Sequence, residues 1–129
     1  MEKTNKYLSL TEGVPPYHVL AEANSIGDDL VVMISGGEKP HVGAVAIGIP
    51  RSSLANPENI SATASVFALV GHKEDDLARI MARKLAASLQ RNVVVTVGIH
   101  VDQILPEGIG SIEQSCRNIL EELINQLSP

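Results

Sequence analysis

Histidine and acidic side chains follow short apolar runs at two places in the sequence. His72 and Glu74 come just after the apolar residues 66–70, and His100 and Asp102 come at the end of a second apolar run. Imidazole and carboxylate groups together suit a divalent transition metal such as zinc, manganese or iron, or acid–base chemistry near neutral pH. These two segments are therefore the first candidates for a functional site.

The pattern between the two segments predicts that they meet in space. Residues 66–70 and 92–102 have the apolar, β-branched character of strands, and residues 74–90 have the apolar spacing of a helix. A strand–helix–strand unit normally makes its two strands parallel, so we expect neighbouring strands that end at the same edge of one sheet. Open α/β sheets usually bind ligands outside the carboxyl ends of such strands.

Length and composition narrow the class of protein. A chain of 129 residues makes one domain with room for a real core, and 44% hydrophobic but only 2% aromatic residues predict a core of Val, Ile, Leu and Ala. A net charge of -5 without a lysine and arginine cluster argues against nucleic acid or an anionic membrane as the main partner. The single Cys116 falls on a helical apolar stripe, so it is interpreted as a core residue. We expect a reducing, cytoplasmic compartment because one cysteine gives no disulfide framework, and we expect neither export nor membrane insertion because no apolar run approaches the roughly 18 residues of a spanning helix.

The fold class predicted is α/β, and more narrowly α+β, with a single mixed sheet in the order β-β-β-β-α-β-α and both helices on one face. One domain should cover residues 1–129, with residues 1–16 as a loosely held N-terminal arm because Pro15 and Pro16 forbid helix. The uncovered sheet face has enough apolar residues to be covered by a homo-oligomer or another partner. The predicted elements are strands at 17–24, 28–35, 41–49 and 61–70, a helix at 74–90, a strand at 92–102, and a helix capped by Ser111 with Gln114 three residues later.

A third histidine is predicted to join the same edge. If the strand at 41–49 is antiparallel to both the strand before it and the strand after it, its first residue lies where the strand after it ends. That residue is His41. The ligand set predicted for a metal is therefore His41, His72 and His100. The alternative, in which these are loop histidines that make caps and turn hydrogen bonds, remains open.

Glycines near the same edge suggest a weaker phosphate-binding motif. Gly36, Gly37 and Gly71 can present backbone N–H groups to a phosphate, with Lys39 and Lys73 as counter-charges. The sequence has neither a Walker motif nor a GxGxxG fingerprint, and most Gly-Gly turns exist because the backbone needs a positive φ.

Three segments of the chain resemble a known family. They are Lys-Pro-His-Val-Gly-Ala-Val at 39–45, Gly-His-Lys-Glu-Asp at 71–75 and Gly-Ile-His-Val-Asp at 98–102. The chain is similar here to the small D subunit of gallate-type decarboxylases, the LpdD-like prenylated-flavin chaperones. The positions that both match the family and meet at the predicted edge are His41, His72, Glu74, His100 and Asp102.

The resemblance implies a fold similar to that of proteasome-assembly chaperones. It also implies that the chain does not itself decarboxylate, but binds prenylated FMN and helps to load or mature it in a UbiD-type (hydroxy)aromatic acid decarboxylase. The cofactor-binding residues expected are Gly36, Gly37, His41, Gly71, His72, Lys73, Glu74, His100 and Asp102. No catalytic residue is assigned.

Three functional hypotheses follow. In the first, a cofactor chaperone holds the flavin phosphate at this edge, with or without a metal, and an apolar sheet face or oligomer interface shelters the ring and prenyl group. In the second, a small metal-dependent enzyme uses the three histidines as ligands and Glu74 as general base. In the third, an assembly module docks a partner through its sheet face and takes no small ligand.

Overall fold

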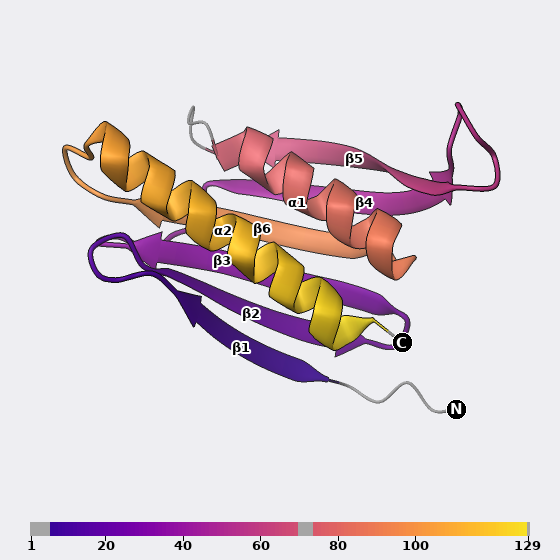
Figure 1. The fold of residues 1–129 in the computed structure, drawn as a ribbon, viewed down its shortest axis with the longest axis horizontal. Coiled ribbons are helices and arrows are strands. Elements are labelled where there is room, and N and C mark those ends of the chain that lie inside the picture. Colours follow the sequence, from indigo (N-terminus) through magenta and orange to yellow (C-terminus); the bar gives the residue numbers. More distant parts are fainter. Residues whose placement is uncertain (1–5, 70–73, 129) are drawn as a thin grey trace.

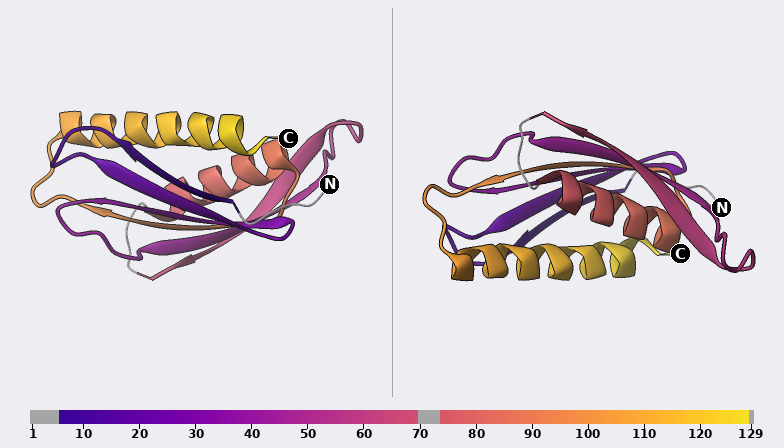
Figure 2. Two further views of the ribbon diagram at one scale, coloured as in Figure 1. Left: turned by 90° about the horizontal axis from the view of Figure 1, so that it is seen from below. Right: turned by 90° about the horizontal axis from the view of Figure 1, so that it is seen from above.

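A computed structural model describes residues 6–69 and 74–128, and there it contains two layers, a six-stranded sheet and two helices (Figure 1). Both helices lie on one face of the sheet, as predicted (Figure 2). The elements are β1 (Tyr7–Glu12), β2 (Val19–Ile26), β3 (Asp29–Gly37), β4 (Ala44–Ser52), β5 (Ile60–Ala68), α1 (Glu74–Leu89), β6 (Val93–His100) and α2 (Pro106–Leu127).

The strand order differs from the predicted order. The sheet runs β1-β2-β3-β6-β4-β5, with β3 and β6 parallel and every other pair antiparallel. Strands β5 and β6 do run parallel and end at the same edge, but β4 lies between them, so the prediction that they are neighbours is wrong. The predicted pairing of the second and third expected strands is also wrong, because β6 lies between β3 and β4. A central place suits β6, whose residues are bulky and apolar on both faces from Val93 to Val95.

Residues 7–12 are a strand rather than part of a loose arm. β1 pairs with β2 along its whole length, and Leu8 and Leu10 pack against the core. The C-terminal helix also holds this edge: Lys6 Nζ donates to the carbonyl of Gln126 (2.9 Å). The two prolines that suggested an arm lie after the strand, in the connection to β2. Residues 1–5 lie outside the described part of the chain.

The second helix begins five residues before the predicted cap. Pro106 starts α2, and Leu105 before it provides no side-chain cap. Proline suits this position because its fixed φ fits a helix and the N–H that it lacks would have no helical partner. Ser111 therefore lies inside the helix, and the predicted capping box is wrong. Gly108 in the first turn allows a close approach, since a Cβ there would collide with the ring of Tyr17.

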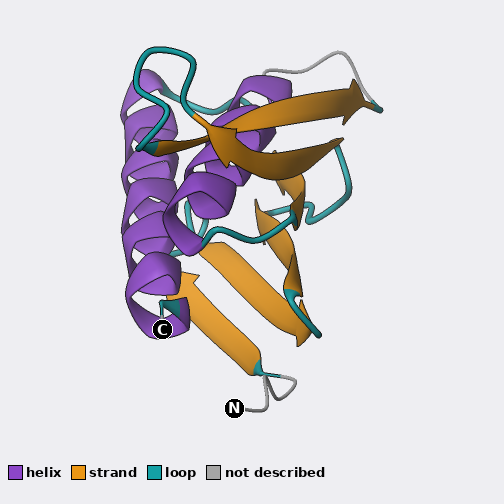
Figure 3. Cartoon of the chain, turned by 90° about the vertical axis from the view of Figure 1, so that its right-hand side faces the viewer, coloured by secondary structure: helices purple, strands orange, loops and turns teal. Residues whose placement is uncertain are grey.

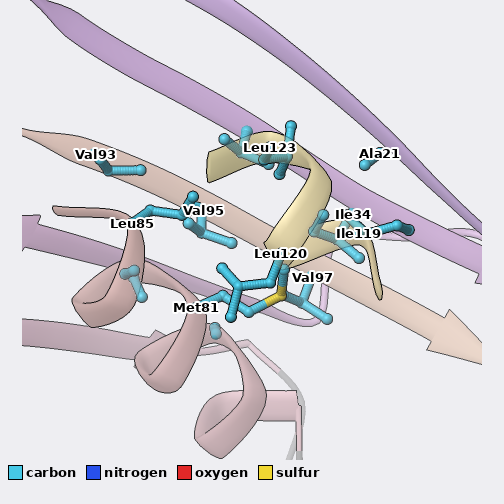
Figure 4. Close-up of a cluster of buried hydrophobic side chains, with 14 of the residues drawn as sticks. Ala21, Ile34, Met81, Leu85, Val93, Val95, Val97, Ile119, Leu120 and Leu123 are labelled. Carbon is cyan, nitrogen blue, oxygen red and sulfur yellow. The ribbon is translucent and has the colours of Figure 1, made fainter. Parts of the chain in front are cut away.

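The core lies between the helices and one face of the sheet (Figure 4). Val93, Val95 and Val97 of β6 face Leu85 of α1 and Leu123 of α2, and all five are buried. Burial also raises the pKa of the Cys116 thiol to about 12, which agrees with a core position for this residue. Neither helix of the described chain has the combination of length and apolar character that a bilayer span requires.

The other face of the sheet is uncovered in this single chain, and its strands turn progressively from one edge to the other (Figure 3). A row of residues crosses this face in register: Met33 pairs with Thr96, Thr96 with Val45, and Val45 with Phe67. Phe67 is 70% exposed and Met33 41%. We call this surface the open face.

Candidate functional site

The predicted site lies at one end of the sheet, where β3, β5 and β6 end and where β4 and both helices begin (Figure 1). We call this end the rim. His41, Glu74, His100 and Asp102 all lie at the rim, as predicted from the topology. Gly71, His72 and Lys73 fall outside the described residues, so their predicted place in the site stays a prediction.

Residues 38–43, which we call the crossing segment, pass over the end of β6. The backbone N–H groups of Glu38 and Lys39 donate to the carbonyl of His100 (2.7 and 3.2 Å), and that of His41 approaches the carbonyl of Gly98 (3.4 Å). The segment can lie this close because position 98 is glycine: a Cβ there would collide with the backbone carbonyl of His41. The crossing segment thereby brings His41 beside the end of β6.

His41 is held between two hydrogen-bond acceptors. Its Nδ1 lies 2.8 Å from the carbonyl oxygen of Lys39, and its Nε2 lies 3.1 Å from Oε1 of Glu74. A carbonyl oxygen can only accept, and a carboxylate can only accept, so an imidazolium ring with a proton on each nitrogen satisfies both contacts. His41 and Glu74 therefore form a hydrogen-bonded pair, which is an ion pair when the ring is protonated, and their side chains are only 30% and 14% exposed.

The Glu74 carboxylate joins three elements of the rim. It lies at the first residue of α1, where the helix dipole favours a negative charge. Its second oxygen accepts the backbone N–H of Ile99 in β6 (3.3 Å), and it occupies the space above Gly43, where a Cβ would collide with it. Both oxygens are thus engaged in interactions that hold the crossing segment, α1 and β6 together.

The second histidine makes a separate and more exposed pair. His100 Nε2 lies 2.8 Å from Oδ1 of Asp102, and Lys39 Nζ lies 3.5 Å from the same oxygen. The hydrogen bond from His100, followed by the charge of Lys39, lowers the pKa of Asp102 below its usual value. The backbone N–H of Asp102 donates to Oε1 of Glu38 (2.8 Å), which ties the backbone at Asp102 to a side chain of the crossing segment.

These two pairs do not form a metal site by themselves. Among the residues that the structure describes, no group of three His, Cys, Asp or Glu side chains is placed to hold a metal ion. Both ring nitrogens of His41 are engaged, and Nε2 of His100 is engaged with Asp102. The set His41, His72 and His100 therefore has no support from its two described members, and the position of His72 is outside the described chain.

The glycine pair has a packing role, and the N–H of Gly37 is already engaged, so this donor does not support the phosphate role predicted for it. Gly37 has φ +73°, and its N–H donates to the carbonyl of His18 (3.0 Å), so that donor is used inside the sheet. A Cβ on Gly36 would collide with the carbonyl of His18, and a Cβ on Gly37 would collide with the carbonyl of His100. The backbone of these residues thus allows β2, β3 and β6 to close together at the rim.

His18 is a rim residue that the sequence pattern led us to interpret as a surface residue on the polar side of the first strand, whereas the structure buries its Nδ1. It directly precedes β2, whose first residue Val19 pairs with Gly36 at the end of β3. Within the described chain, its Nδ1 is the one buried side-chain nitrogen or oxygen that has no hydrogen-bond partner. The predicted hairpin of strands 17–24 and 28–35 could have placed His18 at the rim. The first strand of a hairpin begins beside the end of the second.

Two hollows lie away from the rim, along α1. One of about 250 Å³ is lined by Ser61, Ile80, Arg83, Lys84 and Ala87. The other, of about 200 Å³, lies between the helices and is lined by Leu77, Ile80, Met81, Lys84, Glu113, Cys116, Arg117 and Leu120. Both have cationic groups beside apolar side chains, and the second also has Glu113, so they are a second place to test for binding of a ligand that is apolar in one part and anionic in another.

Comparisons with known proteins agree on the family. Residues 13–128 match the family model described as prenylated flavin chaperone LpdD-like domain. A relative in Lactiplantibacillus plantarum, named Protein LpdD, is 26% identical over 111 residues, which cover 86% of this chain and 78% of the relative.

A solved structure supports the fold. The chain is similar to a component of a crystal structure described as a novel chaperone complex for yeast 20S proteasome assembly, with a TM-score of 0.62 and 18% identity. The match covers 96% of this chain and 98% of that one. At this identity the likeness concerns the fold alone, and it agrees with the fold expected from the sequence.

Proposed function

The chain belongs to the prenylated flavin chaperone LpdD-like family, and from this premise we propose that it binds prenylated FMN and helps to load or mature it in a UbiD-type (hydroxy)aromatic acid decarboxylase. In this proposal it acts in the cytoplasm as a homo-oligomer and does not catalyse decarboxylation. The single observation that carries the proposed site is that the exposed ion cluster of the rim and the apolar row of the open face lie on the same face of the sheet, on either side of the place where the crossing segment passes over Gly98.

The shared surface follows from the alternation of side chains along β6. His100 and Thr96 are separated by four residues, so both point to the same face of the sheet. Four residues of strand span about 13 Å. That is the scale of a flavin mononucleotide, so a ligand that reaches across the crossing segment above Gly98 could have its phosphate beside His100 and its ring system toward the row that contains Met33, Val45 and Phe67.

The charged end of this surface suits a phosphate that competes with an internal carboxylate. Lys39 and His100 both contact Asp102, and the side chains of Lys39, His100 and Asp102 are 65%, 42% and 60% exposed. A bound phosphate would take over these two cationic or hydrogen-bonding partners from Asp102. The beginnings of α1 and α2 lie at the same rim and add their positive dipole ends. Gly71, His72 and Lys73 are proposed members of the same site on the sequence alone.

The apolar end suits the ring and the prenyl group. Phe67, Met33 and Ile47 are 70%, 41% and 40% exposed, although large apolar side chains are normally buried. Aromatic and aliphatic side chains on an open surface can cover the flavin ring without forming a closed pocket, which is compatible with later transfer to a decarboxylase. His41 and Glu74 position this site indirectly, because their hydrogen bonds hold the crossing segment that contains Lys39.

Titration of the purified chain with prenylated FMN tests the site. We expect His72→Ala together with His100→Ala to raise the Kd at least tenfold, because two hydrogen-bond donors to the phosphate are lost, while the melting curve stays near that of the wild type. Phe67→Asp should weaken binding by a similar factor. The matched control is Lys84→Ala, which removes a cation that lines both hollows along α1.

The results distinguish a flavin site at the rim and open face from one along α1. Wild-type affinity in the histidine double variant and in Phe67→Asp would contradict the rim and open-face site. If Lys84→Ala is the variant that loses binding, the flavin lies along α1 instead. A loading assay then tests the role: apo-decarboxylase and prenylated FMN should give active enzyme faster with the wild-type chain than with the histidine double variant.

The open face also favours a second candidate function, docking of a partner protein without a small ligand. Ile47 and Ile49 extend the apolar surface along β4 and are 40% and 53% exposed. Binding of the decarboxylase that survives the rim variants, together with no detectable flavin binding by the wild type, would support this second function.

A further inference from the structure

One side of α1 carries two cations that no described residue neutralises. Ile80, Arg83, Lys84 and Ala87 follow the spacing i, i+3, i+4, i+7, so they lie along one side of the helix, next to the stripe that packs in the core. No acidic residue stands three or four positions from Arg83 or Lys84. Within the described chain, neither side chain makes a hydrogen bond or an ion pair.

The other bases of the described chain each have an acceptor. Arg79 Nη1 donates to Oδ1 of Asp76 (2.8 Å), and Arg117 Nη2 donates to Oε1 of Gln114 (3.0 Å). Carbonyl, carboxylate or hydroxyl oxygens accept from Lys6, Lys39, Arg51 and Arg91. In a chain with a net charge of -5, two adjacent cations without an acceptor are an exception.

The two cations line a hollow of about 250 Å³ together with a third unused donor. Ser61, near the start of β5, lines the same hollow, and its hydroxyl makes no hydrogen bond within the described chain. α1 lies over β4 and β5 here (Figure 1), and Ala62 and Ala64 face it from β5 with short side chains. The hollow thus collects a guanidinium, an ammonium and a hydroxyl group, and none of its lining side chains is acidic.

From this arrangement we propose that the hollow binds a small carboxylate whose body is a single apolar ring, the class to which the (hydroxy)aromatic acids belong. Three donors without an acceptor among the lining side chains specify an anion. The planar guanidinium of Arg83 can bind both oxygens of a carboxylate or stack on an aromatic face, and Lys84 adds a second charge. Ile80, which is 50% exposed, and Ala87 provide apolar surface for the ring.

The size of the hollow selects among anions. Pockets for drug-sized ligands usually have volumes of about 300–1,000 Å³, so about 250 Å³ suits one ring with its carboxylate and is small for a complete flavin nucleotide. A free phosphate would leave Ile80 and Ala87 uncovered. The neighbouring hollow of about 200 Å³ also contains Glu113, whose charge would repel an anion, so we place the acid in the first hollow.

The identity of the acid rests on the proposed function, because a decarboxylase of (hydroxy)aromatic acids would have the same class of molecule as its substrate. The anion site itself does not depend on flavin binding. It lies along α1, whereas the proposed flavin site lies at the rim and on the open face. A chain with both sites would bind the cofactor and the acid separately.

NMR titration of the isotope-labelled chain with para-hydroxybenzoate tests the proposal. We expect a Kd on the order of 1 mM, which suits a ligand of about ten non-hydrogen atoms, and the largest shifts at the amides of Ser61, Arg83 and Ala87. Arg83→Gln with Lys84→Gln should raise the Kd at least tenfold, because both charges are lost. The matched control is Arg79→Gln, which removes a cation of the same helix that pairs with Asp76 and lines neither hollow. Its Kd should stay within twofold.

Two further comparisons separate the charge of the ligand from its shape. Para-hydroxybenzamide lacks the charge, and acetate and inorganic phosphate lack the ring, so each should bind at least tenfold more weakly. Ala87→Leu fills the hollow without changing a charge and should also weaken binding of para-hydroxybenzoate. Ser88→Leu, at the exposed next position, should not.

Three results would overturn the proposal. They are the absence of localised shifts at ten times the expected Kd, a wild-type Kd in the double glutamine variant, and equal binding of the neutral amide. Prenylated FMN should bind with the same Kd in that variant and in the presence of para-hydroxybenzoate. If the acid displaces the flavin, the acid has no site of its own and the proposal fails. Loss of flavin binding alone would contradict the proposed function and leave the anion site in place.

Discussion

The rim contains two histidine–carboxylate pairs that look alike in sequence and differ in their surroundings. His41 and Glu74 come from segments 33 residues apart, are mostly buried, and connect the crossing segment with α1 and β6. His100 and Asp102 are two residues apart, are exposed, and share their charge with Lys39. Burial and the number of connected elements therefore separate a pair that maintains the fold from a pair that is available to a ligand.

The two pairs should differ in free energy because a donor or acceptor that loses its partner is placed differently in each of them. Removing a partner from the buried pair leaves donors or acceptors that water cannot easily reach, which costs the full desolvation of those groups. Removing a partner from the exposed pair leaves groups that water satisfies at once.

Glu74→Ala should have the largest effect on stability. It leaves the His41 ring and the Ile99 N–H without their acceptor, and we expect the free energy of unfolding to fall by about 2–3 kcal/mol. Chemical denaturation measures this change. Asp76→Ala is the control in the same helical turn, since Asp76 is exposed and pairs with Arg79, and its effect should stay within about 0.5 kcal/mol. Equal losses in the two variants would contradict the contrast.

Gly43→Ala should reproduce much of this loss without removing a charge. The new Cβ would collide with the Glu74 carboxylate and displace it, so we expect a loss of about 1–3 kcal/mol. In a double-mutant cycle with Glu74→Ala the losses should not add. Gly110→Ala is the matched control, because a Cβ there meets open space and alanine favours the helix. If the two stability losses add fully, the loss in Gly43→Ala does not come from displacement of Glu74.

The exposed pair should affect ligand binding and leave stability within about 0.5 kcal/mol. Asp102→Asn keeps a hydrogen-bond acceptor for His100 but removes the negative charge that competes with a phosphate. If the phosphate of prenylated FMN binds here, the Kd should fall about threefold, opposite to the effect of removing His100. Fluorescence titration with prenylated FMN measures the Kd of both variants. A Kd that rises in both variants would mean that Asp102 contacts the ligand favourably.

The smallest expected effect concerns the pKa of Asp102, which acid titration measures. The pKa of Asp102 is below its ordinary value of 3.8, because His100 and Lys39 stabilise the charged form. A carboxyl group with a lowered pKa contributes stability that is present above the ordinary value and is lost as the pH falls through the lowered value. NMR of the Asp102 carboxyl carbon measures this pKa, and His100→Ala should raise it toward 3.8. No change in that variant would mean that the hydrogen bond does not cause the shift.

Sequence patterns were enough to place several rim residues, and the reason is general. The direction of a strand follows from its connections, so His41 and His100 had to lie at the same end of the sheet whichever strands were neighbours. The neighbour order itself was wrong in two places because β6 inserts between β3 and β4. Its apolar residues on both faces were a readable sign of a central strand. The edge strand β1 was missed because two prolines lie just beyond it.

The sequence by itself determined the fold class, the family resemblance and the end of the sheet at which histidine and acidic residues gather, because local periodicity and strand direction are encoded in neighbouring residues. It could not determine that His41 pairs with Glu74 and His100 with Asp102, nor that His18 lies at the same rim with a buried nitrogen. Only the tertiary structure decided those contacts, since they depend on how closely the crossing segment approaches β6 over Gly98 and how closely Glu74 approaches Gly43. Identical residue types thereby acquire different roles, one pair inside the packing and the other in reach of a ligand.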